Sequence, residues 1–201
     1  AHDAGEHSFR HRVAGLFPHH RIHYTCHPRT RQEITAMIKL HTTLGVITLE
    51  LDHARAPSTA ANFLQYARDG YYEGTLFHRV ISNFMIQGGG LGPDMNQKPA
   101  RPPIRNEADN GLKNQIGTVA MARTSDPHSA TSQFFINLKD NDFLDHRGQT
   151  NQGWGYCVFG RVVDGMDAIN AIAKVATTSR RGHQDVPVEN VLIEKTEVIG
   201  E

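Results

Sequence analysis

The sequence has few cysteines and no excess of charge of one sign. Cys26 and Cys157 are the two cysteines among 201 residues, too few for a disulfide framework, and they indicate a reducing compartment. Lysine plus arginine equals aspartate plus glutamate, 21 each, which argues against a surface that neutralises nucleic-acid phosphates. No apolar run approaches the roughly 18 residues of a membrane span, and AHDAGEHSFRHR lacks a signal-peptide core. We expect a cytoplasmic protein without nucleic-acid or membrane partners.

Regular patterning is missing from the first part of the chain. Residues 1–36 hold seven of the thirteen histidines and five arginines but no lysine. Their apolar residues follow neither the helical nor the strand period, whereas the pattern becomes regular from Met37 onward. We expect 1–36 to be an irregular extension, a cloning remnant or translated upstream sequence. Residues 37–201 should form one domain.

The extension contains the run HHRIHYTCH. Imidazole and thiolate groups at such spacings could hold zinc or nickel; here they are His19, His20, His23, Cys26 and His27. No carboxylate lies close in sequence to orient them. Adventitious metal binding is therefore favoured over a physiological site. An organelle transit peptide is an alternative, but the acidic residues of the segment argue against it.

The region after Met37 reads mainly as strands. Residues 37–42 and 46–52 alternate at period two around a turn, which predicts a hairpin. Residues 57–69 carry an apolar stripe at helical spacing, with Pro57 in the first turn and Gly70 at the exit, which predicts a helix. Residues 88–116 are rich in Gly, Pro and Asn and should be mostly loop.

The remaining elements complete a mostly β pattern. Further strands are expected at 75–81, 84–87, 117–123, 132–138, 156–163 and near 191–198, with a second helix at 166–176. These make roughly eight strands and two helices without alternation of strand and helix. A closed eight-stranded antiparallel β-barrel capped by two α-helices satisfies the pattern and removes exposed sheet edges.

One stretch, FHRVISNFMIQGGG at 77–90, places an arginine and a glutamine within an apolar run. A surface salt bridge and a tight turn would explain them. A binding face that needs an apolar surface beside a fixed donor is the alternative. Met85 should share a face with Gln87, and in SQFFINL Phe135 should share one with Gln133. Two strands that pair an apolar group with an amide could hold a small hydrophobic ring and the peptide attached to it.

Other candidate sites are weaker. The triple glycine lacks the Gly-Lys-Ser/Thr of a phosphate loop. Asp126, His128 and Ser129 lie close in sequence, but no nucleophile elbow accompanies them. Cys157 within a predicted strand is more typical of a small buried group than of a nucleophile. Trp154 fits packing at least as well as substrate contact.

The motifs FHRVISNFMIQGG, GTVAMAR, SQFFIN and VFGRVVDGMDAI, in this order and spacing, resemble those of the cyclophilins, the prolyl peptidyl isomerases. The resemblance spans essentially all of 37–201, and NEADNGLKN and GWGYCVFG are most similar to the small cytoplasmic bacterial branch. It implies a peptidyl-prolyl cis-trans isomerase that accelerates rotation about X-Pro bonds and assists protein folding. It implies no cofactor or metal, proline-containing peptides and folding proteins as partners, and a monomer.

The resemblance also implies roles for single residues. Arg79 becomes the catalytic arginine. The walls of the proline pocket become Phe84, Met85, Phe135 and Leu144. The groups that contact the substrate backbone become Gln87, Ala122 and Gln133.

Three further binding positions depart from the common eukaryotic pattern. Phe143 stands where tryptophan is typical, Tyr156 where a pocket histidine is typical, and Arg123 where an asparagine offers its backbone. These departures imply weak binding of cyclosporin, the family's cyclic-peptide inhibitor. A peptide-binding or chaperone module without turnover is the alternative function; the arginine beside the pocket favours the enzyme.

Overall fold

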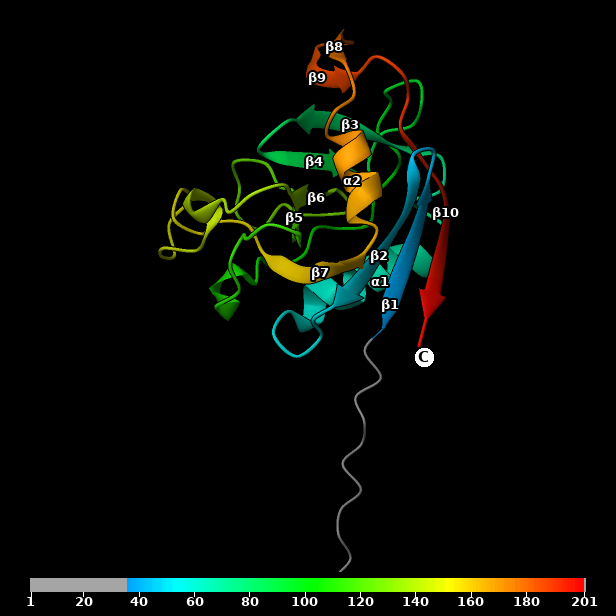
Figure 1. Ribbon diagram of the computed structural model, residues 1–201. Coiled ribbons are helices and arrows are strands. Elements are labelled where there is room, and N and C mark those ends of the chain that lie inside the picture. The colour runs from blue at the N-terminus through cyan, green and yellow to red at the C-terminus, as the bar shows by residue number, and fades with distance from the viewer. Residues whose placement is uncertain (1–35, 201) are drawn as a thin grey trace, which may run out of the picture. The chain divides into compact units, whose positions relative to one another are not determined.

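The structure, a computed structural model, describes residues 36–200. Eight strands close into an antiparallel barrel in the order β1-β10-β3-β4-β6-β5-β7-β2 (Figure 1). Their bounds are Met37–Thr42 (β1), Gly45–Leu51 (β2), Thr75–Ile81 (β3), Met85–Gly88 (β4), Thr118–Met121 (β5), Phe134–Asn137 (β6), Val158–Asp164 (β7) and Leu192–Ile199 (β10). The predicted fold class is confirmed.

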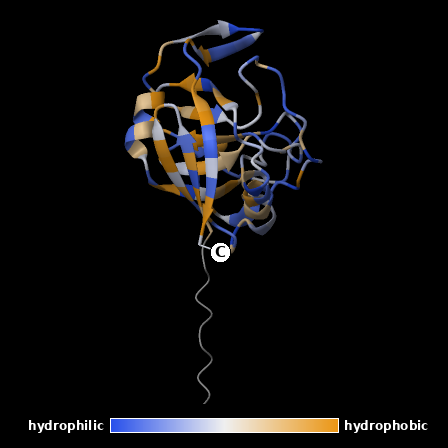
Figure 2. Ribbon diagram, turned by 90° about the vertical axis from the view of Figure 1, so that its right-hand side faces the viewer, coloured by the Kyte–Doolittle hydropathy of each residue, from blue (hydrophilic) through white to orange (hydrophobic). Residues whose placement is uncertain are grey.

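The barrel interior is the main core of the domain. Hydrophobic and hydrophilic residues alternate along the strands (Figure 2), as expected when one face of each strand is buried. Helix α1, Pro57–Arg68, contributes Phe63 to this core. The Phe63 ring lies 4.9 to 5.2 Å from the rings of Tyr72, Phe134 and Phe159. These contacts fix α1 against the barrel.

A residue far along the chain accepts hydrogen bonds from the first backbone N–H groups of α1. The Glu107 carboxylate accepts hydrogen bonds from the backbone N–H groups of Ser58 and Thr59, at 3.2 and 2.8 Å. It also accepts one from the Thr59 hydroxyl at 2.7 Å. Orphan N–H groups of a helix N-terminus need such partners. The contact ties α1 to the long segment before β5, which contains the short 3-10 helix Ala108–Asn110 (η1).

Two features differ from the expected elements. Helix α2, Met166–Ile172, ends before residue 176. Lys174 N–H bonds to the Ala171 carbonyl and Val175 N–H to the Ile172 carbonyl. These bonds join residues three apart, which is the spacing of a 3-10 helix and not that of an α-helix. A separate hairpin of β8, Thr177–Arg180, and β9, His183–Pro187, was not expected.

Two expectations fall outside the described residues. The run HHRIHYTCH and the boundary at Met37 both concern residues 1–36, of which the structure describes Ala36 alone. They stay predictions. Within residues 36–200 no helix is long and apolar enough to cross a membrane.

Candidate active site

A row of paired residues crosses the outer face of four neighbouring strands. Arg79 on β3 pairs with Gln87 on β4, Gln87 with Phe135 on β6, and Phe135 with Ala120 on β5. Residues directly opposite each other in an antiparallel ladder point to the same face. The register therefore brings the arginine, the amide and the aromatic ring together. No ion pair among the described residues includes Arg79.

A second apolar cluster surrounds Phe135, separate from the barrel core; because we expect it to receive the proline ring, we call it the pocket surface. Its buried members are Met85, Ala120, Phe135 and Val158. The partly buried residues packed against them are Ile81, Phe84, Leu112, Ala122, Leu144 and Tyr156. Phe134 and Ile136 face the barrel core instead, so the predicted alternation along SQFFINL is confirmed.

The two glutamines form an amide chain beside this surface. Gln87 Nε2 donates to Gln133 Oε1 at 3.0 Å, and Gln133 Nε2 donates to Gln97 Oε1 at 2.9 Å. These hydrogen bonds orient the amides of Gln87 and Gln133. Gly90 allows this arrangement, because a Cβ there would lie 2.4 Å from the Gln133 Cγ atom.

A short 3-10 helix, η2 (Asp142–Leu144), carries the next two pocket residues. Phe143 is 56% exposed and stacks on Phe84, with ring centroids 5.7 Å apart and planes inclined by 26°. Leu144 packs against the pocket surface, and its carbonyl accepts the Tyr156 N–H at 2.9 Å. Phe143 therefore lies at the exposed edge of the pocket surface, and Leu144 packs within it.

Buried asparagines hold η2 in place. Asn141 Nδ2 donates to the Phe84 carbonyl at 3.0 Å and to Asn137 Oδ1 at 2.8 Å. Asn137 Nδ2 donates in turn to Asn114 Oδ1 at 3.2 Å. The three side chains are at most 1% exposed. This network connects β4, β6 and the loop before β5 to the rim of the pocket.

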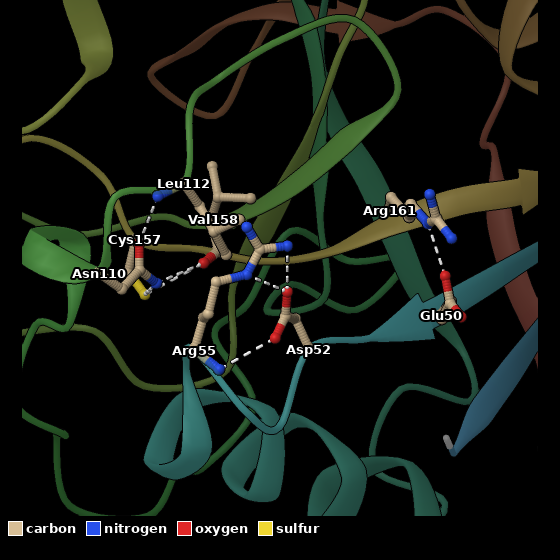
Figure 3. A network of polar contacts seen from close by, with 8 residues as sticks. All are labelled: Glu50, Asp52, Arg55, Asn110, Leu112, Cys157, Val158 and Arg161. Carbon is tan, nitrogen blue, oxygen red and sulfur yellow. Dashed lines mark hydrogen bonds and ion pairs between the residues drawn. The ribbon is translucent and has the colours of Figure 1, made fainter. Parts of the chain in front are cut away.

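Leu112, a loop residue that the sequence did not single out, also packs against the pocket surface. Asn110 Oδ1 accepts the Leu112 N–H at 2.9 Å, and Asn110 Nδ2 donates to the Val158 carbonyl at 3.1 Å (Figure 3). These bonds dock Leu112 beside β7. Ala120 and Val158 were not predicted to line the site either. Each alternates along its strand with a residue of the barrel core, Val119 or Phe159, and this pattern could have predicted that they face the other side. Leu112 has no such pattern, because it lies in an irregular segment.

Arg123 and Tyr156 form the remaining edge. The Arg123 Cζ atom lies 4.6 Å from the centroid of the Tyr156 ring. That ring meets Phe135 edge-on, with centroids 5.6 Å apart and planes at 78°. All eleven residues expected at the site therefore lie in or around one patch.

The weaker candidates have structural explanations. Trp154 is 7% exposed and packs between the rings of His128 and His146, at 4.8 and 5.2 Å. His128 Nδ1 accepts the Asn106 N–H at 3.1 Å, so it does not serve Ser129. Burial, with nearby carboxylates, raises the pKa of Cys157 to about 11, which keeps the thiol protonated at neutral pH.

Comparisons with known proteins agree with this arrangement. The family described as "Cyclophilin type peptidyl-prolyl cis-trans isomerase/CLD" matches residues 37–198. The chain is 62% identical to peptidyl-prolyl cis-trans isomerase cyp18 of Streptomyces antibioticus, covering 81% of this chain and 98% of the relative. It is 57% identical to peptidyl-prolyl cis-trans isomerase B of Escherichia coli K12, covering 81% and 99%.

A solved structure extends the likeness to three dimensions. It is a cyclophilin-type peptidyl-prolyl cis-trans isomerase of Cryptosporidium parvum, determined in the presence of the dipeptide Ala-Pro. It superposes with a TM-score of 0.70 at 26% identity, covering 82% of this chain and 99% of that one. The chain belongs to the family of cyclophilin-type peptidyl-prolyl cis-trans isomerases.

Proposed function

We propose that this isomerase binds the proline ring of an X-Pro peptide against Phe135 and stabilises the twisted amide with Arg79. The observation that carries the proposal is the row Arg79–Gln87–Phe135, which sets a cation, an amide and an apolar surface on one face. Phe84, Met85 and Leu144 wall the ring, and Tyr156 closes one side. We assign Phe143 to the outer rim.

The chemistry needs no bond to be made or broken. Partial double-bond character gives the amide a rotation barrier of about 18–20 kcal/mol. Catalysis therefore means binding the twisted amide more tightly than either planar form. In the twisted state the prolyl nitrogen regains its lone pair and becomes a better acceptor. A guanidinium, always charged and with fixed donors, favours that localisation.

The backbone contacts hold one side of the bond while the other rotates. Gln87 and Gln133 are ordered by their mutual hydrogen bond and retain polar atoms for the peptide. Ala122 donates its N–H to the Gln133 carbonyl at 2.9 Å, which leaves the Ala122 carbonyl for the substrate. Because these backbone and amide groups are already ordered, less entropy is lost when the peptide aligns with them.

We infer that the protein acts on folding proteins in the cytoplasm, as a monomer and without a cofactor. The low cysteine content and the free thiol of Cys157 suit a reducing compartment. Proline isomerisation takes tens to hundreds of seconds and can limit folding, so unfolded chains are natural substrates.

The test compares Arg79→Ala with Arg161→Ala in an X-Pro peptide assay. Arg161 lies on β7 in an ion pair with Glu50, away from the pocket surface, and is matched in charge. Loss of one preorganised donor typically costs on the order of 10²–10³ in rate, so Arg79→Ala should lose most of kcat/KM while Arg161→Ala keeps it. A folded Arg79→Ala protein with normal turnover would remove Arg79 from the mechanism. Binding without turnover by the parent would favour the chaperone alternative.

A further inference from the structure

An arginine that forms no ion pair within residues 36–200 borders the pocket surface. Arg123 lies two residues beyond the end of β5 and is partly buried. Its guanidinium covers the Tyr156 ring, and the Tyr156 ring covers the edge of Phe135. One aromatic ring therefore separates this cation from the surface on which we place the proline.

Carbonyl oxygens orient the guanidinium. Nε donates to the Gly155 carbonyl at 3.0 Å, and Nη1 donates to the Thr124 carbonyl at 2.9 Å. Nη2 makes a longer contact of 3.5 Å with the Asn151 carbonyl. These neutral acceptors fix the side chain but leave its charge uncompensated. No ion pair within residues 36–200 includes Arg123.

A cation held in this way suits a carboxylate. The planar guanidinium carries several N–H donors in a fork that matches the two oxygens of a carboxylate. The three carbonyl contacts leave some of these donors unused. Because stacking on Tyr156 already orders the side chain, a partner would lose little further side-chain entropy on binding.

The strand spacing limits where the carboxylate lies in a substrate. Neighbouring strands are about 4.8 Å apart. Three such spacings separate β3, which carries Arg79, from β5, so the distance across the sheet is roughly 14 Å. Phe135 on β6 is one strand from β5. An extended peptide advances about 3.3–3.6 Å per residue. A side chain about one to three residues from the proline therefore reaches Arg123.

We propose that Arg123 selects X-Pro sequences that carry an aspartate or glutamate within about three residues of the proline, by pairing with its carboxylate. The inference rests on the proposed function, because that function places the proline ring against Phe135. It makes Arg123 a specificity residue rather than a provider of backbone contacts alone.

The test uses peptides with one proline and a single Glu, Gln or Lys at each of the three positions on either side. Isomerisation is measured by exchange NMR, which needs no coupling protease. The readout is the ratio of kcat/KM for the Glu peptide to that for the Gln peptide. An exposed charge pair contributes modestly, so we expect a ratio of about two to five at one position or more, with Lys below Gln. The ratio should fall toward one as salt is added.

Three variants assign the preference to the side chain. Arg123→Gln should bring the ratio to one, and Arg123→Lys should keep part of it. Lys174→Gln removes the same charge from an exposed position after α2 and should keep the parent ratio. Because each ratio comes from one protein sample, partial misfolding of a variant does not change it.

The outcomes separate this proposal from the proposed function. Equal rates for Glu, Gln and Lys at every position, or a preference that survives Arg123→Gln, overturn the role of Arg123 and leave the isomerase assignment intact. Failure of the parent to isomerise even the Gln peptides would overturn the proposed function itself.

Discussion

Phe143 stacks on Phe84 at the rim of the pocket, with ring centroids 5.7 Å apart. More than half of the Phe143 side chain remains exposed. A phenyl ring offers no hydrogen-bond donor and a smaller face than an indole. A large ligand that extends beyond the proline pocket should therefore bind this rim weakly.

We predict that Phe143→Trp strengthens cyclosporin binding by roughly tenfold or more. One net hydrogen bond contributes about 0.5–1.5 kcal/mol, and added contact area increases this, while about 1.4 kcal/mol is tenfold in affinity. Turnover of small X-Pro peptides should change only modestly, because the proposed function places the proline ring against Phe135 and the inner wall rather than on Phe143. Inhibitor titration of both proteins measures the difference.

The matched control is Val188→Trp, which adds an indole to an exposed position after β9. It should leave the affinity for cyclosporin unchanged. Tight binding by the parent with no gain from Phe143→Trp would show that Phe143 does not contact this ligand.

Periodic elements could be predicted from the sequence, and they set most of the site. The alternation along SQFFINL separates Phe135 from the core-facing Phe134, so one period-two pattern located the pocket face. The row Arg79–Gln87–Phe135 additionally needs strand register. Register follows from the closed barrel and not from any single strand.

Elements held by tertiary contacts escaped prediction. In β8–β9 only Val186 and Pro187 are buried, so the hairpin has almost no apolar pattern to detect. Leu112 reaches the pocket because Asn110 binds the β7 backbone. The stacking of Arg123 on Tyr156 joins two distant segments. In the last two cases a side-chain contact, which has no local signal, decides the placement.

We predict that a chain starting at Met37 keeps the turnover of the full chain and nearly the same melting temperature. The patterning of the sequence begins there, and the described domain loses only Ala36. The Ala36 carbonyl accepts the Leu51 N–H at 3.3 Å, a contact that contributes about 0.5–1.5 kcal/mol. Thermal unfolding and peptide turnover of both chains provide the measurement. A large loss of either would show that residues 1–36 support the domain.

Acid should weaken the fold through His78. This side chain is 5% exposed, and its Nδ1 atom has no hydrogen-bond partner among the residues that the structure describes. Burial, with the neighbouring His183, lowers the pKa of His78 to about 4, compared with 6.5 for a free histidine. The unfolded chain therefore takes up this proton at higher pH than the folded one. Stability that is fully present above pH 6.5 is lost as the pH falls toward 4.

The size of this effect can be isolated with His78→Gln. The difference between a pKa of 6.5 and one of about 4 corresponds to roughly 3 kcal/mol. The free energy of unfolding of the parent should fall relative to that of the variant by an amount of this order between pH 7 and pH 4. Denaturant titrations at several pH values give both curves. Parallel curves would show that His78 titrates normally in the folded protein.

The asparagine network should control both stability and the rim of the pocket. Asn141 is fully buried and donates to the Phe84 carbonyl and to Asn137. Asn141→Ala leaves the buried Asn137 Oδ1 atom without this donor, whereas the Phe84 carbonyl keeps the Leu138 N–H at 2.9 Å. An unsatisfied buried acceptor typically costs about 1–3 kcal/mol. Because these bonds tether η2 to β4, the stack of Phe143 on Phe84 should also loosen. We expect kcat/KM for X-Pro peptides to fall severalfold.

A matched substitution separates the network from a general effect of losing an amide. Asn170→Ala changes an exposed position of α2, where alanine favours the helix, so stability should hold or rise slightly and turnover should not change. Denaturant unfolding and peptide turnover are measured on the same samples of both variants. If Asn141→Ala loses stability but keeps full turnover, the network serves the fold alone and η2 does not need its tether to form the site. If it loses neither, water replaces the missing donor and the network is not required.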